Sequence, residues 1–310
     1  MAHSLLCLGE CMIELLATGD FIGPSATSIA GDTLNTSVYA KRIGGAALHT
    51  AYCSAVGADA PSQSALNFIE QEGVDASLVA MDRKRTIGLY ASMVDGDGER
   101  RFVYWRNQSA ARHFFSHDLA TSLSTLPAFD GIFYSAITLA LMSPASRSAF
   151  FEFLDARRSN GCLVAFDSNF RPALWESLDD ARASIANAWR RCDIGLPSAD
   201  DETTLFGDTD DAAIIKRLAD AGVSRGALKR GSRGPLLVGE PGASLSYPPV
   251  GHVIDTSAAG DSFNGAFLAK LLSGGSERCA AAAGHALAAR VIQHRGAIIA
   301  FAHMADMLGE

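Results

Sequence analysis

Three small residues, Ala258, Ala259 and Gly260, precede a single carboxylate, Asp261, at the expected start of a helix. Backbone N–H groups of small residues can approach a ligand closely, and a helix N-terminus adds a partial positive charge. The stretch is therefore a candidate cradle for an anion such as a phosphate. The carboxylate would itself repel an anion, so its presence needs another explanation, of which a helix-capping role is one.

Three further polar stretches follow expected strands, at the positions where open α/β sheets bind ligands. They are SNFR at 168–171, LPSADDE at 196–202 and KRGSRG at 229–234. With the stretch ending at Asp261, they would bring Arg, Lys, Gly backbone and carboxylates to one rim, as nucleotide phosphates and a metal ion require. The chain has no GxxxxGK(S/T) motif and no GxGxxG after a strand, so the common phosphate-binding loops are not supported.

The elements that would position these groups alternate along the chain. Short apolar runs predict buried strands at 5–9, 131–137, 162–167, 193–197 and 226–231. A helix is predicted from the N-cap Ser143 to about Gly161, and two Ala-rich helices over 259–272 and 277–293. Strands alternating with helices predict an α/β fold with a doubly wound, mainly parallel sheet flanked by helices. We expect residues 1–310 to form a single domain.

Two regions break this alternation. Residues 19–32 are rich in turn-forming types, and residues 86–107 predict two strands around the turn DGDG. Such a hairpin could cover a ligand site as a small β lid or could decorate the surface, and the pattern alone leaves both readings open. We take approximately 10–35 and 86–110 as the lid segments.

The bulk composition narrows the classes of partner. The net charge is −8 and no cluster of five or more Lys and Arg residues occurs, so we expect neither a nucleic-acid nor a membrane partner. No apolar run reaches membrane-spanning length, and Glu10 and Glu14 interrupt the apolar run near the N-terminus, so we expect no secretion signal. The six cysteines have neither CxxC nor zinc-ligand spacing, which predicts reduced thiols in a cytoplasmic protein.

The stretch IDTSAAGDSFNGAFL resembles the C-terminal signature of the ribokinase-like (PfkB-type) carbohydrate kinases, DTxGAGDxF followed by a helix. GDTLNTSVYAKRIGG, VGAD at 56–59 and EGVD at 72–75 are similar to the first signature region of that family, so the resemblance spans nearly the whole chain in the family's order. It implies an ATP-dependent kinase in which Asp261 accepts the proton of the attacking hydroxyl and residues 258–260 supply the amide cradle, with Ala258 replacing the usual Gly. We expect the helix N-terminus to keep Asp261 ionised.

Three stretches resemble the substrate-binding segments of the 2-keto-3-deoxygluconate kinases within that family. The resemblance implies sugar-acid contacts from Tyr90, Tyr104 and Arg106 of the hairpin, from Arg171, and from Gly31, Asp32 and Asn35. Two guanidiniums, Arg106 and Arg171, suit a planar carboxylate. Fructokinase-like relatives also carry the segment that holds Arg171, and a cross-strand packing ladder is the alternative explanation for Tyr104 and its neighbours.

On the nucleotide side, the resemblance implies a phosphate and adenine loop that includes Lys229, Gly231 and Gly234, with Asn169 and the cradle residues nearby. Ser198 and Asp201 stand where the family often has the Asn and Glu of an NxxE element linked to magnesium, so Asp201 is an indirect metal candidate. His285 lies where many relatives have an Asn near adenine, although a helix histidine without a ligand is an equal alternative. Glu14 stands near the place of a sugar-binding Asp of ribokinases, which argues against ribose.

These observations predict an ATP- and Mg²⁺-dependent kinase for the terminal hydroxyl of 2-keto-3-deoxy-D-gluconate, with Asp261 as the base and with a homo-oligomer formed through the lid. Two alternatives stay open. One is a fructokinase or another neutral-sugar kinase, and the other is a non-catalytic sugar-acid sensor built on the same fold.

Overall fold

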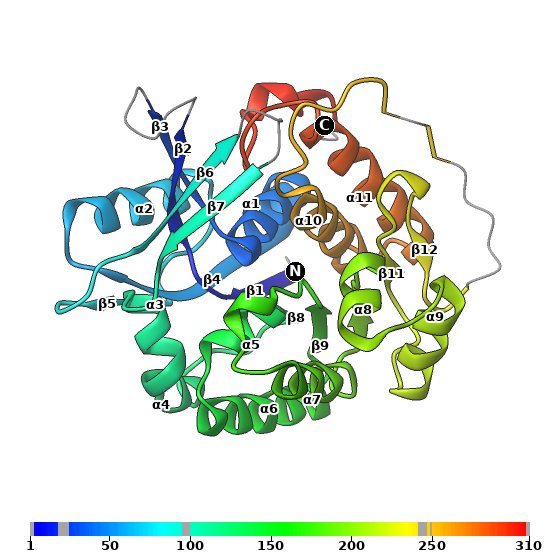
Figure 1. The fold of residues 1–310 in the computed structure, drawn as a ribbon, viewed down its shortest axis with the longest axis horizontal. Coiled ribbons are helices and arrows are strands. Elements are labelled where there is room, and N and C mark those ends of the chain that lie inside the picture. The colour runs from blue at the N-terminus through cyan, green and yellow to red at the C-terminus, as the bar shows by residue number, and fades with distance from the viewer. Residues whose placement is uncertain (1–2, 18–24, 95–99, 241–246, 249, 308–310) are drawn as a thin grey trace.

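The computed structural model describes residues 3–17, 25–94, 100–240, 247–248 and 250–307. A parallel sheet in the order β10-β9-β8-β1-β4-β5 runs through its centre (Figure 1). The strands of this sheet are β1 (His3–Leu8), β4 (Leu48–Gly57), β5 (Val79–Asp82), β8 (Gly131–Ser135), β9 (Leu163–Asp167) and β10 (Ile194–Gly195). Single parallel bridges, Gly195 to Gly226 and Ser198 to Lys229, continue the sheet toward the short antiparallel pair β11 (Ala227–Leu228) and β12 (Leu236–Leu237).

Helices cover both faces of the sheet, as the predicted doubly wound architecture requires. They are α1 (Asp32–Gly44), α2 (Ala60–Gln71), α3 (Ala110–His113), α4 (Leu119–Leu123), α5 (Ala136–Leu141), α6 (Pro144–Ser159), α7 (Leu178–Trp189), α8 (Ala199–Phe206), α9 (Asp211–Asp220), α10 (Ala259–Leu272) and α11 (Glu277–Val291). A π-helical turn, Phe114–Asp118, joins α3 to α4. None of the helices in the described part of the chain is long and apolar enough to cross a membrane.

The strands bury side chains on both faces, which is why they read as continuous apolar runs. In β1, Leu5 and Cys7 pack with residues of α1, α2 and α10, whereas Leu6 and Leu8 pack with residues of α4, α6 and α7. The sheet therefore separates two hydrophobic cores, and α10 lies against both α1 and α11 (Figure 1).

A second, four-stranded sheet in the order β3-β2-β6-β7 projects from one side of the molecule (Figure 1). Its strands are β2 (Met12–Ala17), β3 (Ser25–Ala30), β6 (Gly88–Val94) and β7 (Arg100–Trp105). β2 pairs antiparallel with β3 and parallel with β6, so two segments far apart in the sequence form one sheet. We call this sheet the lid sheet.

The structure confirms the α/β fold with a mainly parallel sheet and the two strands predicted within 86–107; the predicted turn, DGDG, lies outside the described residues. The predicted strand at 131–137 ends at Ser135, because Ser135 and Thr138 form a capping box that starts α5. Residues 19–32, read from the sequence as turn-rich, include the strand β3.

Candidate functional site

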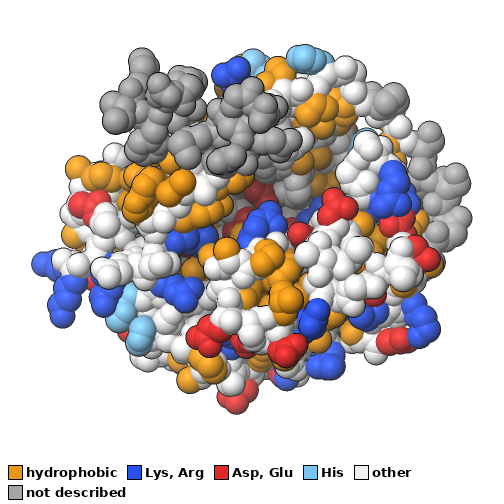
Figure 2. All heavy atoms as spheres, viewed as in Figure 1, with side chains coloured by type: hydrophobic (Ala, Val, Ile, Leu, Met, Phe, Trp, Pro, Cys, Tyr) orange, Lys and Arg blue, Asp and Glu red, His pale blue; other side chains and the backbone are white. Residues whose placement is uncertain are grey.

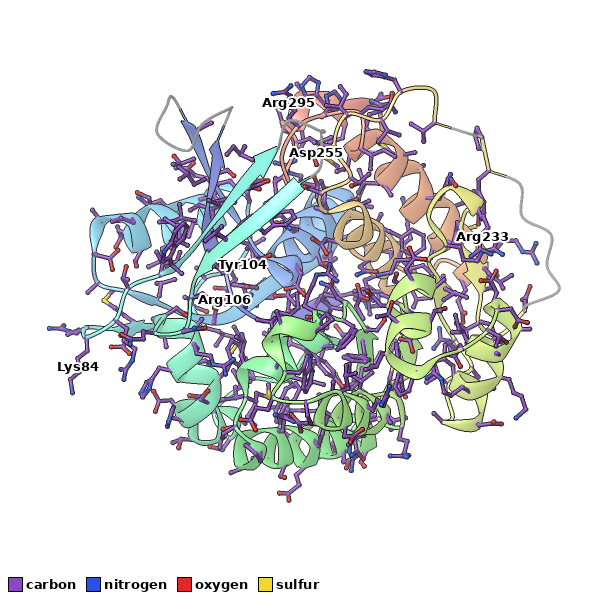
Figure 3. The ribbon with its side chains drawn as sticks, in the orientation of Figure 1. Lys84, Tyr104, Arg106, Arg233, Asp255 and Arg295 are labelled. Atoms are coloured by element: carbon purple, nitrogen blue, oxygen red, sulfur yellow. The ribbon has the colours of Figure 1, made fainter. Side chains whose placement is uncertain are left out.

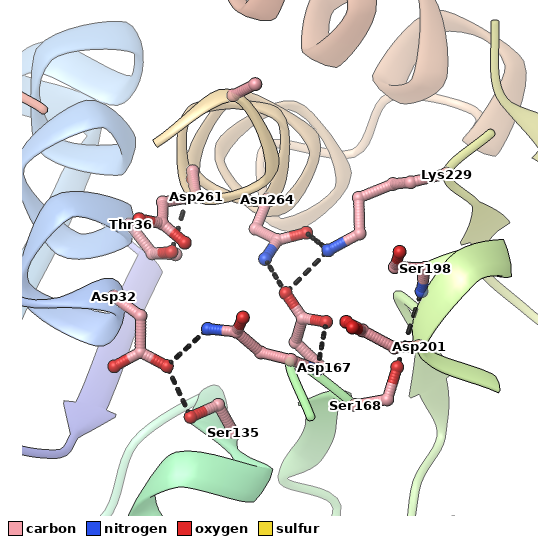
Figure 4. A network of polar contacts seen from close by, with 12 residues as sticks. Asp32, Thr36, Ser135, Asp167, Ser168, Ser198, Asp201, Lys229, Asp261 and Asn264 are labelled. Carbon is pink, nitrogen blue, oxygen red and sulfur yellow. Dashed lines mark hydrogen bonds and ion pairs between the residues drawn. The ribbon is translucent and has the colours of Figure 1, made fainter. Parts of the chain in front are cut away.

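Polar side chains meet at the carboxyl edge of the parallel sheet, and some of them were singled out from the sequence (Figure 4). Asp167 ends β9, Ser135 ends β8, Asp32 begins α1 and Asp261 lies in the first turn of α10. Figure 2 shows the face onto which this edge opens, with acidic and basic side chains gathered in a hollow near its centre. The side chains that could bind and transform a ligand therefore come from four elements that are distant in sequence.

Asp261 is held from the side of α1. Asn35 donates a hydrogen bond from Nδ2 to Oδ2 of Asp261 at 2.8 Å, and the Thr36 hydroxyl donates to the Asp261 carbonyl oxygen at 3.2 Å. The pKa of Asp261 is raised to about 8, mainly by burial and also by the negative charges of Asp32 and Asp167, while the Asn35 hydrogen bond and the charge of Lys229 lower it. The expectation that the helix N-terminus keeps Asp261 ionised is therefore wrong, because desolvation and two neighbouring carboxylates outweigh the dipole.

The small residues before Asp261 form the N-terminus of α10. Ala258 is the N-cap with φ 55° and ψ 18°, and it is the only non-glycine residue with positive φ in the described part of the chain. A non-glycine side chain in this left-handed region costs about 1–2 kcal/mol. At Gly260 an added Cβ would lie 3.5 Å from Nζ of Lys229, so this lysine faces the cradle. The Ala259 N–H donates to the Thr256 carbonyl oxygen at 3.3 Å, so the predicted anion cradle would rest on the remaining backbone N–H groups at this helix end and on Lys229.

Asp167 is a site residue that the sequence reasoning missed. It is buried and accepts hydrogen bonds from Nζ of Lys229 at 2.5 Å and from Nδ2 of Asn264 at 2.6 Å. The Asn169 backbone N–H also donates to it, at 3.0 Å. The sequence did carry a signal, because Asp167 is the last residue of a buried strand, where ligands of open α/β sheets bind. Lys229, expected in the nucleotide loop, therefore also ties β11 to the centre of the site.

Asp32 is anchored by two donors. The Ser135 hydroxyl donates to Oδ2 of Asp32 at 2.5 Å, and Nδ2 of Asn169 donates to the same oxygen at 2.9 Å. Asn169 was expected on the nucleotide side, but its side chain lies against Asp32, on the side expected to bind sugar. Gly31 precedes Asp32, and a Cβ there would lie 2.2 Å from the Glu10 carbonyl oxygen, so only glycine fits between the start of α1 and the end of β1.

Ser198 and Asp201 lie on the opposite side of Asp167 from Asp32 (Figure 4), and Arg171 lies beside Asp201. The Ser198 backbone N–H donates to the Ser168 hydroxyl at 3.3 Å, and Nη1 of Arg171 lies 3.6 Å from Oδ1 of Asp201. Burial raises the pKa of Asp201 to about 6, although the charge of Arg171 opposes this. No group of three or more His, Cys, Asp or Glu residues in the described ranges could hold a metal ion.

The rest of the predicted nucleotide side forms a separate cluster. Gly231 and Gly234 bound a short 3-10 turn after β11, and a Cβ on Gly234 would lie 2.5 Å from the Tyr247 ring. Tyr247 packs against the His285 ring at 4.4 Å between centroids, and burial lowers the pKa of His285. Among the described residues neither Tyr247 Oη nor His285 Nε2 has a hydrogen-bond partner. Tyr247 was missed from the sequence because no motif includes it.

The lid sheet brings the predicted tyrosines together. Tyr90 and Tyr104 are direct cross-strand partners with ring centroids 5.7 Å apart, so the cross-strand ladder exists. Burial raises the pKa of the Tyr104 phenol, the charges of Arg106 and Arg171 lower it, and the charge of Asp32 raises it. Tyr104 therefore lies within electrostatic reach of both arginines and of the sheet edge.

Arg106 differs from the expectation of a guanidinium free to meet a ligand carboxylate. Nη2 of Arg106 lies 2.5 Å from Oε2 of Glu10, and both side chains are buried. Its guanidinium carbon lies 5.8 Å from the centre of the Tyr104 ring, beside which it is drawn in Figure 3. The sequence reasoning missed Glu10 as a site residue, although Glu10 follows a buried strand as the other site residues do.

Comparisons with known proteins agree with this geometry. Residues 2–303 match the sequence profile described as pfkB family carbohydrate kinase. The chain is 40% identical over 308 residues to the 2-dehydro-3-deoxygluconokinase of Escherichia coli K12, covering 96% of this chain and 98% of that protein. It is 39% identical to the protein of the same name from Dickeya dadantii, covering 96% of each.

Among solved structures, the aminoimidazole riboside kinase of Salmonella enterica, complexed with its riboside and an ATP analogue, superposes with a TM-score of 0.82. It is 23% identical and covers 96% of each chain, which supports the fold. Phosphoryl transfer depends mainly on positioning and charge stabilisation, which a carboxylate in the first turn of a helix beside a lysine could supply. The chain belongs to the pfkB family of carbohydrate kinases, and it is an ATP-dependent sugar kinase.

Proposed function

We propose that this kinase transfers the γ-phosphoryl group of ATP to the terminal hydroxyl of 2-keto-3-deoxy-D-gluconate, giving 2-keto-3-deoxy-6-phosphogluconate and ADP. Relatives that are 39–40% identical over nearly the whole chain are named for this activity. The structural observation that carries the proposal is the Arg106 guanidinium 5.8 Å from the centre of the Tyr104 ring, with the charges of Arg171 and Asp32 also acting on the Tyr104 phenol. Two guanidiniums whose charges reach the same phenol favour a carboxylate-bearing substrate, and a carboxylate such as Asp32 favours its hydroxyl groups.

Asp261 is the proposed base. The substrate hydroxyl oxygen forms a bond to the γ-phosphorus while the bond from that phosphorus to the β,γ-bridging oxygen breaks, and the hydroxyl proton passes to the Asp261 carboxylate. Asn35, on α1, orients this carboxylate through its 2.8 Å hydrogen bond. A pKa near 8 lies close to working pH, which suits a group that must accept and then release a proton.

The phosphates are proposed to lie between the cradle of residues 258–260 and Lys229. Lys229 faces Gly260 and is tied to Asp167 and Asn264, so its charge is held in one place before the nucleotide arrives. Fixed donors of this kind stabilise the charge that develops on the transferred group. The nucleotide base is proposed to lie near Gly234, Tyr247 and His285, where unpartnered polar atoms line a turn.

Mg²⁺ is proposed on the triphosphate, where it would neutralise charge on the β- and γ-phosphates. Mg²⁺ in kinases takes one or two protein carboxylates and completes its shell with phosphate oxygens and water. The residues present fit this pattern, because Asp201 is a largely buried carboxylate whose Arg171 partner is 3.6 Å away and whose neighbour Asp167 is also acidic. Asp201 would act directly or through water.

The test is ADP release from the purified chain with ATP, Mg²⁺ and a panel of sugars and sugar acids. We expect turnover with the keto-deoxy acid and at least tenfold lower kcat/KM with fructose. ADP release with fructose alone would favour the neutral-sugar kinase, and no release with any member of the panel would favour the sensor. Arg106→Ala should raise KM for the acid far more than KM for 3-deoxy-D-fructose, in which a hydroxymethyl group replaces the carboxylate.

We also propose that the reaction takes place in the cytoplasm, where ATP is available and thiols stay reduced. All six cysteines are free thiols, and five of them are buried. Proteins in oxidising compartments commonly carry disulfides, whereas the cysteines of this chain form none, which supports a reducing compartment.

A further inference from the structure

A buried ion pair lies at the root of the lid sheet, where the chain leaves the core and returns to it. Glu10 stands between the end of β1 and the start of β2, and Arg106 directly follows β7. Glu10 is 1% exposed and Arg106 is 6% exposed, with Oε2 and Nη2 separated by 2.5 Å. Removing one partner of such a pair leaves an uncompensated buried charge, which is strongly unfavourable.

Glu10 is itself fixed by a second anchor. The Ser109 hydroxyl donates to Oε1 of Glu10 at 2.5 Å, and Ser109 is the N-cap of α3, so its own position is set by the helix. Gly88, the first residue of β6, packs against the ion pair. A Cβ on Gly88 would lie 2.9 Å from Oε1 of Glu10 and 3.4 Å from Cβ of Arg106. The carboxylate and the arginine stem therefore pack on bare backbone.

Glu10, Arg106 and Arg112 together leave one positive charge in excess, and the weaker effects of Arg147 and Glu176 on the pKa of Arg112 have opposite signs. Arg112 lies close enough to both groups that its pKa is lowered by burial and by Arg106 and raised by Glu10. Nη1 of Arg112 donates to the Ala140 carbonyl oxygen at 2.8 Å, so Arg112 is held in place as well. Among the described residues Nε of Arg106 has no hydrogen-bond partner. An anionic ligand would supply both the missing charge and the missing acceptor.

On the basis of the proposed function, we propose that Glu10 is a positioning residue for recognition of the substrate carboxylate. Glu10 holds the Arg106 guanidinium beside Tyr104, where the carboxylate of the sugar acid binds. Glu10 makes no contact with the substrate in this arrangement. Its effect passes through Arg106, whose long side chain has many rotamers that Glu10, Ser109 and Gly88 together restrict.

Removal of the Glu10 charge has two opposing effects, and the geometry decides between them. Without Glu10 the net positive charge rises, which alone would strengthen binding of an acid. However, Arg106 and Arg112 would then repel each other in a buried site, and Arg106 would lose the partner that orients it. Since Arg106 is buried and anchored mainly through Glu10, we expect loss of orientation to dominate.

The experiment compares Glu10→Gln, Gly88→Ala and Arg106→Gln, using the keto-deoxy acid and 3-deoxy-D-fructose as substrates. Glu10→Gln should raise KM for the acid at least tenfold, with kcat changed less than about threefold and KM for the neutral sugar nearly unchanged. Gly88→Ala keeps every charge and presses on the pair, so it should shift the acid KM in the same direction. The double variant Glu10→Gln/Arg106→Gln should be no worse than Arg106→Gln alone.

Glu72→Gln is the matched control, because Glu72 forms a 2.8 Å ion pair with the buried Arg42 away from the site. It should change stability but leave the ratio of the two KM values as it is. If the Glu10 variant does not fold, Gly88→Ala carries the test. The proposal is overturned if Glu10→Gln lowers KM for the acid or raises KM for both substrates by the same factor. It is also overturned if Glu10→Gln leaves the ratio of the two KM values constant while Arg106→Gln changes that ratio. A constant ratio in Arg106→Gln as well would instead reject the proposed substrate.

Discussion

Asp261 shows how burial changes the chemistry that a residue type suggests. As a lone carboxylate it has an ordinary pKa of 3.8, but between Asp32 and Asp167 in a desolvated site its pKa rises to about 8. From pH 4 to 8 the folded chain therefore keeps a proton that the unfolded chain releases, so this group makes the fold less stable as pH rises through that window. The unfavourable placement is consistent with a functional rather than a structural role.

Asp261→Asn should lower turnover by roughly 10²- to 10⁴-fold while sugar binding is retained, because the base is lost and the shape is kept. The variant should also gain on the order of 1–2 kcal/mol of stability near pH 8, which is about 2–4 °C in Tm. Calorimetry at pH 5 and pH 8 checks this, with the gain expected to grow with pH. Full turnover in the variant would reject Asp261 as the base.

Lys229 should set the acidic limit of activity, because its charge lowers the pKa of Asp261. In the wild-type protein kcat/KM should rise with pH through about 8, and Lys229→Met should move this limb to higher pH and raise KM for ATP. Lys270→Met is the control, since Lys270 is exposed in the last turn of the same helix. An unchanged profile in Lys229→Met would contradict the electrostatic coupling.

Among the individual residues, the sequence placed Asp32, Asn35 and Asp261 in positions that the structure brings together, since each lies at the start of a helix beside the sheet edge. It missed Asp167 and Glu10, because the signature segment around Asp167 points to Arg171 and because Glu10 lies within an apolar run. The rule that selected the predicted site, a polar residue just after a buried strand, applies to both. The pairing of Glu10 with Arg106, 96 positions apart, could not follow from any local pattern.

At the scale of elements, the predicted strands and the Ala-rich helices were those with continuous apolar runs or clear caps. Helix α1 was missed because it buries Thr33, Asn35, Thr36 and Ser37 together with its apolar residues, so its sequence lacks an amphipathic period. Packed between the sheet and α10, this helix has no wide polar face. The strand β4 was missed for a related reason, since His, Thr, Tyr and Ser interrupt its apolar run.

The N-terminus of α10 carries a strain that can be measured. Ala258→Gly should relieve the left-handed conformation at φ 55°, offset partly by the greater freedom of glycine in the unfolded chain. The net gain should be roughly 0.5–1 kcal/mol, or about 1–2 °C in Tm, with activity retained. Ala259→Gly, one residue later in ordinary helical geometry, should give no gain. A loss of stability in Ala258→Gly would show that the alanine methyl group packs more favourably than the strain costs.

At the scale of the whole molecule, the lid sheet presents its β7 edge with exposed apolar side chains. Phe102, Val103, Tyr104 and Trp105 are each 39–50% exposed, and β7 is a terminal strand of the sheet. Exposed apolar edges of this kind favour pairing with another chain. We predict a dimer formed through the lid sheets of two copies.

Val103→Glu tests this prediction, because Val103 lies on the face of β7 opposite Tyr104 and the change leaves the tyrosine pair in place. Light scattering after size exclusion should show about twice the chain mass for the wild-type protein and a monomer for the variant. Met81→Glu, an exposed apolar residue of β5, is the control and should stay dimeric. A monomeric wild type at micromolar concentration would remove the prediction.

Because β2 pairs in parallel with β6, the two halves of the lid sheet, β2 with β3 and β6 with β7, depend on each other for stability. A chain engineered to lack residues 88–105 would leave β2 and β3 as an isolated two-stranded ribbon, which is marginal in water, with the inner edge of β2 unpaired. Deleting β2 and β3 would likewise leave β6 and β7 as an isolated two-stranded ribbon. We therefore expect homologues to gain or lose the lid sheet as a whole. A shortened enzyme that lacks one half of the lid sheet should aggregate rather than remain active.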